Sequence, residues 1–165
     1  MKYKNKYPYP YLPEGREILY VPLDNVFMLL AKSYARAQSL DSRMPGAAVV
    51  VKNGRVIGIG ANGSTYHETH ECERKRLQCK TGEGYELCEG CHPHNHSERQ
   101  AITGALAQGS DTQGADLYLW GHWWFCKDCW EYIIRYGIRN CYVVERSEIL
   151  FNVDDPENSI GRQFE

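Results

Sequence analysis

The sequence predicts an α/β layered fold in which helices pack on a central sheet. The stretch PGAAVVVKNGRVIGIGANG, residues 45–63, predicts two strands joined at Asn53-Gly54, because this dipeptide is a strong signal for a hairpin turn. Two further apolar runs, ADLYLWG at 115–121 and RNCYVVE at 139–145, each follow a segment with helical spacing. The order strand, strand, helix, strand, helix, strand is typical of a sheet covered by helices.

The N-terminal segment, residues 1–22, is predicted to be an extended arm. Its first part, MKYKNKYPYPYLP, interleaves Tyr with Lys and Pro and can form neither a regular helix nor a central strand. The tyrosines either dock on the body of the protein or on a neighbouring subunit, or the arm is a partly ordered tail. Residues 23–150 form the body, and residues 151–165 are expected to be a polar C-terminal tail.

A first helix is predicted at the start of the body. Asp24 or Asn25 can cap it. The positions that follow the helical period are Val26, Leu29, Leu30, Ser33, Tyr34 and Ala37.

The middle of the chain, residues 64–95, is polar and rich in Gly, Cys and His. This insertion is long for a loop without structure inside a compact domain, so something is expected to fasten it. Helices over residues 96–108 and 126–137 follow, and each has a Gly at or just after its expected end.

Composition limits the class of protein. With 165 residues the chain fits one domain, and its net charge of −2 provides no overall field to attract a polyanion. No apolar run approaches a membrane span and the N-terminus lacks the apolar core of a signal peptide, so a cytoplasmic protein without membrane partners is expected. The 7 Cys are odd in number and occur beside 6 His, which favours metal binding over a disulfide framework.

Two short motifs carry the predicted chemistry. His96-x-Glu98 and Cys126-x2-Cys129 each lie where a helix should begin, and cysteines three residues apart in a first helical turn can reach one ion. One His and two Cys leave the fourth tetrahedral position of Zn2+ for water, which is typical of a catalytic zinc. Glu98 would lie beside this water as general acid and base. The pair of motifs matches the zinc deaminase signature, although either motif alone also occurs by chance, in structural zinc sites or in redox pairs.

The chain resembles the zinc-dependent cytidine/deoxycytidylate deaminase superfamily, most closely its dCMP deaminase branch with the competence-operon relatives. The likeness extends over about residues 24–145 and rests on GAAVVVKNGRVIGIGANGS, ECERKRLQCKTGEGYELCEG, HSERQAI and DLYLWGHWWFCKDCWEYIIRYGIRNCYVV. It implies a cytidine deaminase-like three-layer fold, with a central mixed sheet flanked by helices and a zinc-stabilised insertion. It also implies a hydrolase that converts a cytosine nucleotide, dCMP in the first place, to the uracil nucleotide and ammonia.

Several residues depart from the family's usual motifs. Phe125 stands where the family has Pro before the first zinc cysteine, and Ser97 replaces Ala between the ligand His and the Glu. Trp123 and Trp124 precede the metal cysteines in an unusually long aromatic segment, and we expect them to line the substrate pocket. Together with Ser97 they are candidate substrate contacts.

The resemblance also implies a second, structural zinc in the insertion. His67, Cys72 and Cys88 match metal-binding positions of the family, and Cys91 is the natural fourth ligand because it follows Cys88 by three residues. His70 in place of His67, or Cys79 in place of one of the cysteines, remains an alternative, as do free thiols and solvated histidines. Cys141, within an apolar strand, is expected to be a buried core residue.

Recognition of the rest of the substrate is less specified by the sequence. By the resemblance Asn62 binds the nucleotide sugar, although Asn-Gly is a turn signal in any protein. Candidates for a 5′-phosphate contact are Arg43, Lys127 and the run 74–76. A homo-oligomer is expected. Two other functions stay open: a deaminase of single-stranded nucleic acid or of another base derivative, and a zinc-stabilised binding module without catalysis.

Overall fold

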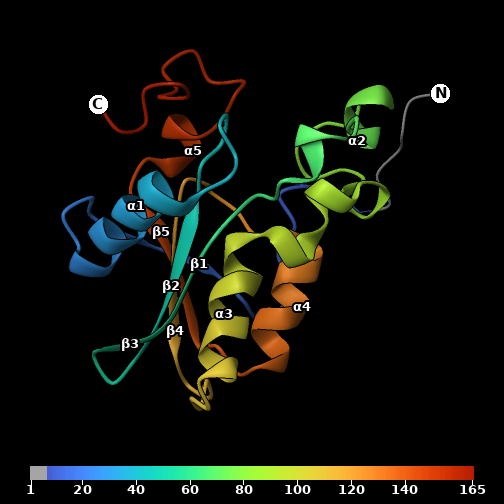
Figure 1. The fold of residues 1–165 in the computed structure, drawn as a ribbon. Coiled ribbons are helices and arrows are strands. Elements are labelled where there is room, and N and C mark those ends of the chain that lie inside the picture. The colour runs from blue at the N-terminus through green and yellow to red at the C-terminus, as the bar shows by residue number, and fades with distance from the viewer. Residues whose placement is uncertain (1–6) are drawn as a thin grey trace.

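The computed structural model describes residues 7–165. One mixed sheet with the strand order β1-β5-β4-β2-β3 forms the centre of the molecule (Figure 1). Its strands are β1 (Ile18–Val21), β2 (Ala47–Lys52), β3 (Arg55–Ala61), β4 (Asp116–Trp120) and β5 (Asn140–Val144). The helices are α1 (Val26–Gln38), α2 (Glu73–Arg76), α3 (Ser97–Ala107), α4 (Lys127–Arg135) and α5 (Ser147–Leu150). The predicted three-layer fold with a central mixed sheet and flanking helices is confirmed.

The two faces of the sheet have separate cores because strand side chains alternate in direction. Leu117 and Leu119 of β4 pack with α3 and α4, whereas Tyr118 and Trp120 of the same strand pack toward α1. Figure 1 shows α1 on one face and the α3–α4 pair on the other. The site described below lies where α3 and α4 begin.

The β2–β3 hairpin forms as predicted. Asn53 and Gly54 both have positive φ angles, 52° and 74°, as a tight hairpin turn of this type requires. Strand β2 then pairs antiparallel with β4, and β4 pairs parallel with β5. Strand β1 was not predicted: it is a short edge strand, parallel to β5, with Ile18 opposite Cys141.

Helix α1 begins as predicted but buries a different face. The Asn25 side chain caps it by accepting hydrogen bonds from the backbone N–H groups of residues 27 and 28, at 3.0 and 3.1 Å. The buried residues are Met28, Ala31 and Ala35. The apolar positions that indicated the helix do not face the core: Val26, Leu29 and Leu30 are exposed, Val26 by 67%.

Helix α3 packs very closely on β3. A Cβ atom at Gly60 would lie 2.4 Å from the backbone nitrogen of Ala101, and one at Gly58 would lie 2.3 Å from its carbonyl oxygen. Only glycine permits this approach of helix to strand. The close packing sets the height of the first turn of α3 above the sheet, and this turn carries two of the predicted site residues.

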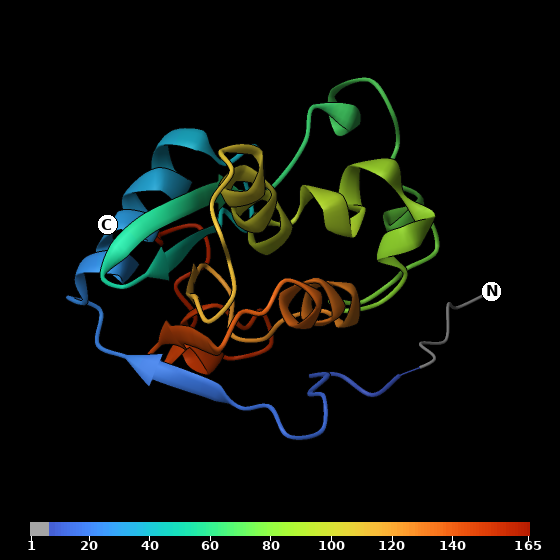
Figure 2. The same cartoon turned by 90° about the horizontal axis from the view of Figure 1, so that it is seen from below.

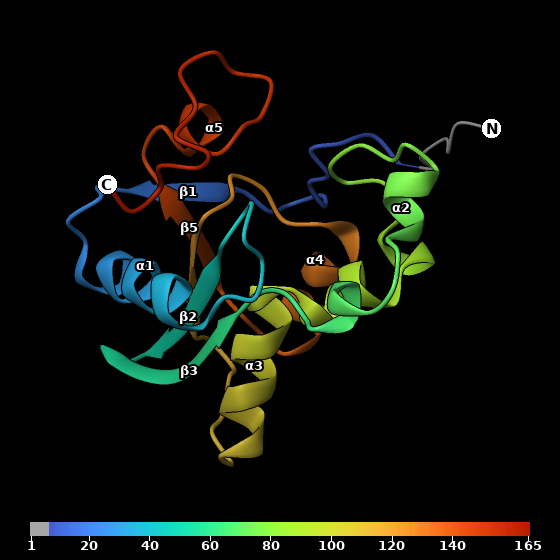
Figure 3. The same cartoon turned by 45° about the horizontal axis from the view of Figure 1, so that its top comes forward.

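The insertion and the arm lie together at one end of the molecule. Figure 2 shows the described part of the arm passing α4, and Figure 3 shows α2 and its neighbouring loops standing away from the sheet. Arg16 donates to the carbonyl of Ile138 at 2.8 Å, Trp130 donates to the carbonyl of Tyr11 at 3.2 Å, and the Tyr9 ring packs on Trp124. From residue 7 onward the arm therefore contacts the body; residues 1–6 of the predicted arm lie outside the described residues.

The C-terminal segment, which is mostly polar in composition, packs on the body of the protein through two aromatic side chains. The ring of Phe164 stacks on Trp120 at 5.0 Å, and Phe151 is buried against the same side chain. Over residues 7–165, the structure contains no helix of the length and apolar character that a membrane crossing needs.

Candidate active site and second metal cluster

The three predicted catalytic ligands converge at the N-termini of two helices. His96 is the N-cap residue of α3, Cys126 is the N-cap residue of α4, and Cys129 lies in the first turn of α4. Nδ1 of His96 lies 3.5 Å from each of the two Sγ atoms. Zinc bonds of about 2.3 Å to sulfur and 2.0–2.1 Å to nitrogen would hold these atoms about 3.6 Å apart at a tetrahedral angle. The donor set and its spacing therefore fit a zinc ion.

The charges of this cluster favour a metal-binding state. Burial pushes the pKa of the Cys126 thiol up, but the hydrogen bonds from Cys129 and the positive field of His96 outweigh it and bring the pKa to about 5. Burial and the neighbouring Cys126 raise the pKa of Cys129. The lowered pKa favours the thiolate form of Cys126, and a bound cation would favour deprotonation of Cys129 as well.

Glu98 lies beside the cluster in the first turn of α3 and is only 6% exposed. Its pKa is raised, first by burial and also by the negative Cys126, although His96 acts in the opposite direction. Ser97 donates a hydrogen bond to Oε2 of Glu98 at 3.3 Å. A buried carboxylate with a raised pKa beside three metal ligands is well suited to take up and release a proton.

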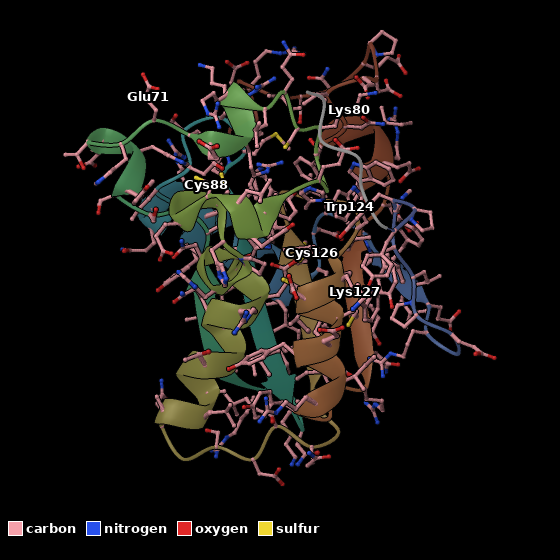
Figure 4. The ribbon with its side chains drawn as sticks, turned by 90° about the vertical axis from the view of Figure 1, so that its right-hand side faces the viewer. Glu71, Lys80, Cys88, Trp124, Cys126 and Lys127 are labelled. Atoms are coloured by element: carbon pink, nitrogen blue, oxygen red, sulfur yellow. The ribbon has the colours of Figure 1, made fainter. Side chains whose placement is uncertain are left out.

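A cavity of about 700 Å³ opens onto this cluster. Glu98, His96 and Cys126 line it together with Trp124. Figure 4 shows Trp124 and Cys126 below the insertion that carries Cys88. Trp123 is not among the lining residues, and Phe125 is fully buried in the core.

The insertion brings together the four predicted ligands of a second site. The ligand atoms of His67, Cys72, Cys88 and Cys91 all lie within 4.8 Å of one another. Sγ of Cys72 and Sγ of Cys91 are 3.6 Å apart, close to the roughly 3.8 Å that two thiolates adopt on one zinc. The set of one His and three Cys can fill all four positions of a tetrahedral metal.

The two alternative ligands lie outside this group. The ring of His70 stacks on Tyr66 at 4.2 Å, and Cys79 contributes no atom to the cluster. Gly90 allows His67 to reach it, because a Cβ atom at Gly90 would lie 2.7 Å from the His67 ring.

The two clusters are joined by direct contacts. Burial lowers the pKa of His96, but the negative Cys126 and, to a smaller extent, Glu98 and the backbone of Cys91 raise it above its usual value. Tyr85, in the single turn η2 (Tyr85–Leu87), packs its ring edge-on to His96 at 4.7 Å. Ligand histidines in metal sites are commonly oriented by such a carbonyl contact.

Asn62 lines the cavity, but its side chain is already engaged. Its Oδ1 accepts from the backbone nitrogen of Gly46 at 2.9 Å and from the Ser39 hydroxyl, and its Nδ2 donates to the carbonyl of Met44 at 2.8 Å. These bonds match the turn-forming interpretation of this residue. A contact with the sugar stays a prediction.

The candidate phosphate contacts separate into two groups. Arg74 is held by the carbonyls of residues 80 and 83, Arg76 pairs with Glu73, and Lys127 pairs with Glu131. Arg43 and Lys75 are exposed, line the cavity, and form no ion pair within the described part of the chain. These two are the cations available at its mouth.

His122 is a cavity residue that the sequence reasoning missed. Its Nδ1 accepts from the backbone N–H groups of Trp123 and Trp124, at 3.0 and 3.4 Å. Burial, with a contribution from His96, lowers its pKa to about 4, so the ring is neutral at physiological pH. The only signal in the sequence was its place in the unusual aromatic segment WGHWWF, in which we expected the tryptophans to line the pocket.

The fold and the paired helix-start ligands define a zinc-dependent deaminase. The profile of the family described as cytidine and deoxycytidylate deaminase zinc-binding region matches residues 22–145, and the chain belongs to this family. A comparison with curated protein sequences gave no match.

Several solved structures are similar to the chain. The dCMP deaminase of cyanophage S-TIM5 in its apo form is 21% identical, with 76% of this chain and 86% of that chain covered and a TM-score of 0.49. A structure from a study of tRNA:A34 deaminases is 27% identical, with 72% and 75% covered and a TM-score of 0.43. A bifunctional deaminase/reductase of Thermotoga maritima is 26% identical, with 71% of this chain and 28% of that chain covered and a TM-score of 0.45. The chain thus spans about a quarter of the length of that protein.

Proposed function

We propose that the protein hydrolyses the 4-amino group of a free cytosine nucleotide, with dCMP as the leading substrate and dUMP and ammonia as products. The observation that carries this proposal is the buried carboxylate of Glu98, which lines the same cavity as the ligand cluster of His96, Cys126 and Cys129. A purely structural metal site has no use for such a carboxylate. The family profile agrees with the reaction class.

In this proposal Glu98 is the catalytic acid and base. Zinc, when bound by His96, Cys126 and Cys129, supplies a Lewis acid that lowers the pKa of the attacking water. Glu98 would take one proton from that water and deliver it to the ring nitrogen N3 while the water oxygen bonds to C4. It would then take the second proton from the new hydroxyl group and deliver it to the 4-amino group, so that the C4–N bond breaks, ammonia leaves and the C4 carbonyl of uracil forms. The raised pKa of Glu98 suits it to this transfer, because a carboxylate with a pKa nearer to neutral pH can both accept a proton from water and give it up to the substrate. Ser97 orients the carboxylate through its hydrogen bond.

The cavity walls support a free nucleotide as substrate. Trp124 offers an aromatic wall near the start of α4, suited to a flat base, and Asn62 is the proposed sugar contact. Arg43 and Lys75 at the mouth are the proposed contacts for the 5′-phosphate. Trp123 acts as packing behind Trp124, whose ring it meets edge-on at 6.3 Å.

The reaction is tested by incubating zinc-loaded protein with dCMP, dCTP, CMP and cytidine while cytosine absorbance and released ammonia are followed. We expect dCMP to have the highest kcat/KM. Changing Arg43 or Lys75 to Gln should raise KM for dCMP more than for cytidine, which has no phosphate. Efficient turnover of a labelled single-stranded oligonucleotide, with no turnover of any mononucleotide, would overturn the proposal in favour of a nucleic-acid deaminase.

A further inference from the structure

The N-terminal arm supports one wall of the active-site cavity through a single aromatic side chain. The Tyr9 ring packs on the Trp124 ring with 4.9 Å between the ring centres and 57° between the ring planes. Trp124 lines the cavity and is only 5% exposed, whereas Tyr9 is not among the lining residues. Tyr9 therefore contacts the aromatic wall from its outer side.

The Tyr9 side chain lies where the arm, the loop between β4 and α4, and the insertion meet. Its hydroxyl oxygen accepts a hydrogen bond from the backbone N–H of Lys127, the first residue of α4, at 3.4 Å. On the insertion, a Cβ atom at Gly82 would lie 2.8 Å from the Tyr9 ring and 3.0 Å from the Trp124 ring. Only glycine permits the insertion to approach the two rings this closely.

Two further rings that contact Trp124 belong to its own loop. The rings of His122 and Trp123 meet it edge-on, at 4.6 and 6.3 Å. A side chain on an irregular loop has no regular ladder of backbone hydrogen bonds beneath it, so its order depends on tertiary contacts. The Tyr9 ring supplies such a contact from a segment more than a hundred residues earlier in the chain.

We infer that Tyr9 is a positioning residue that holds the Trp124 ring in the orientation in which it stacks on the substrate base. This inference rests on the proposed function, in which Trp124 is the aromatic wall for cytosine. A side chain that is already ordered loses less conformational freedom when a ligand binds, so an ordered wall binds the base more tightly. The effect should be the same for dCMP and for cytidine, because both carry the base, in contrast to the effects expected at Arg43 and Lys75.

Substitutions on the arm separate this role from a general loss of packing. Tyr9→Ala removes the ring, and Tyr9→Phe keeps the ring while losing only the hydrogen bond to Lys127. Tyr11→Ala is the matched control, because it removes another arm ring, which meets Tyr7 at 6.2 Å. Trp124→Ala provides a background in which Tyr9 has no wall to hold.

Calorimetry with dUMP, the proposed product, measures binding without turnover, and steady-state kinetics is run in parallel with dCMP and cytidine. In Tyr9→Ala we expect Kd for dUMP and KM for both substrates to rise by about 3- to 10-fold, which corresponds to one aromatic pair contact. The kcat and the zinc content should stay close to those of wild type. Tyr9→Phe and Tyr11→Ala should bind like wild type, and Tyr9→Ala should have no further effect in the Trp124→Ala background.

Two results would overturn the inference while turnover of dCMP by wild type upholds the proposed function. One is wild-type affinity in Tyr9→Ala. The other is an equal loss of affinity when Tyr9→Ala is added to Trp124→Ala, because Tyr9 would then not act through that ring. Absence of turnover with every free cytosine nucleotide overturns both the proposed function and the inference.

A measurement on wild-type protein does not depend on whether Tyr9→Ala folds. Coupling between two sites is reciprocal, so an arm that strengthens base binding must itself be held more firmly when a base is bound. Trypsin cleavage after Arg16, followed by mass spectrometry, reports release of the arm. Saturating dUMP should slow this cleavage by about 3- to 10-fold, whereas deoxyribose 5-phosphate, which lacks the base, should not. A cleavage rate that dUMP leaves unchanged contradicts the inference.

Discussion

The two Cys/His clusters use the same ligand chemistry in different surroundings. The cluster at the helix starts has three ligands, two of them buried cysteines, and a buried carboxylate beside it. The insertion cluster has four ligands, its His67 is exposed, and it holds together a polar segment. Three ligands leave a coordination position for a reacting water, and four ligands close the site. We therefore propose that ligand number and the neighbouring carboxylate, rather than ligand type, distinguish a catalytic zinc site at the helix starts from a structural one in the insertion.

The largest expected effect is that of Glu98→Gln. The amide fills the same space but cannot carry a proton, so turnover should fall by at least about 10²–10⁴-fold. Zinc content and the unfolding temperature should remain close to those of wild type. Steady-state kinetics with parallel metal analysis measures both, and wild-type-like turnover would show that Glu98 is not the proton carrier.

Cys88→Ser should affect the other cluster. We expect bound zinc to fall from about two ions to one per chain, and the unfolding temperature to drop by about 5–10 °C for a loss of a few kcal/mol in a chain of this size. Because the Cys91 backbone and Tyr85 contact His96, turnover should fall by about 10–100-fold, as when a contact that orients a ligand is lost. A ratio of one zinc per chain in wild type, with the same ratio in Cys88→Ser, would contradict a second metal site.

Gly90→Ala tests the approach of His67 without removing a ligand. The new Cβ atom would displace the ring that it meets at 2.7 Å, so zinc should leave the insertion cluster roughly tenfold faster in a chelator. Gly104→Ala is the matched control, because its Cβ atom would meet only the Ile59 carbonyl, at an ordinary 3.6 Å. Equal zinc loss in the two variants would argue against the packing of His67 on residue 90.

The smallest expected effect is on how the stability of the metal-free protein depends on pH. Burial raises the folded-state pKa of Glu98 above its ordinary 4.5. Below that value both folded and unfolded chains hold the proton, so Glu98 imposes no cost. As pH rises from the ordinary pKa through the raised one, wild type should lose stability relative to Glu98→Gln. Urea unfolding in chelator from pH 4 to 8 measures this difference, and a difference independent of pH would contradict the raised pKa.

The elements with local signals could be predicted from the sequence. The β2–β3 turn follows from Asn53-Gly54, and the helix starts at His96 and Cys126 follow from the metal motifs. Strand β1 could not be predicted, because its four residues become a strand only by pairing with β5, more than a hundred residues later. The buried face of α1 was missed because small residues, Ala31 and Ala35, occupy it while larger apolar residues face outward.

In the candidate site, too, the residues with a local sequence signal could be predicted, and those that depend on loop folding could not. Ligand spacing predicted the cluster of His96, Cys126 and Cys129, whereas the family resemblance implied His67, Cys72 and Cys88 and spacing added Cys91. The structure brings the residues together in these two separate groups. The roles of Trp123 and His122 depend on how one irregular loop folds back on itself, and no periodic pattern describes that loop. The position of His122 depends on hydrogen bonds from the backbone N–H groups of Trp123 and Trp124, and these bonds become visible only in three dimensions.

The difference between the clusters is tested most directly by an anomalous-scattering map collected at the zinc edge. The account predicts two peaks per chain. One should lie within bonding distance of His96, Cys126 and Cys129 and have a non-protein fourth ligand near Glu98. The other should be bonded by His67, Cys72, Cys88 and Cys91 alone. The absence of a peak at Cys126 and Cys129, or a fourth protein ligand closing that site, would contradict the central claim.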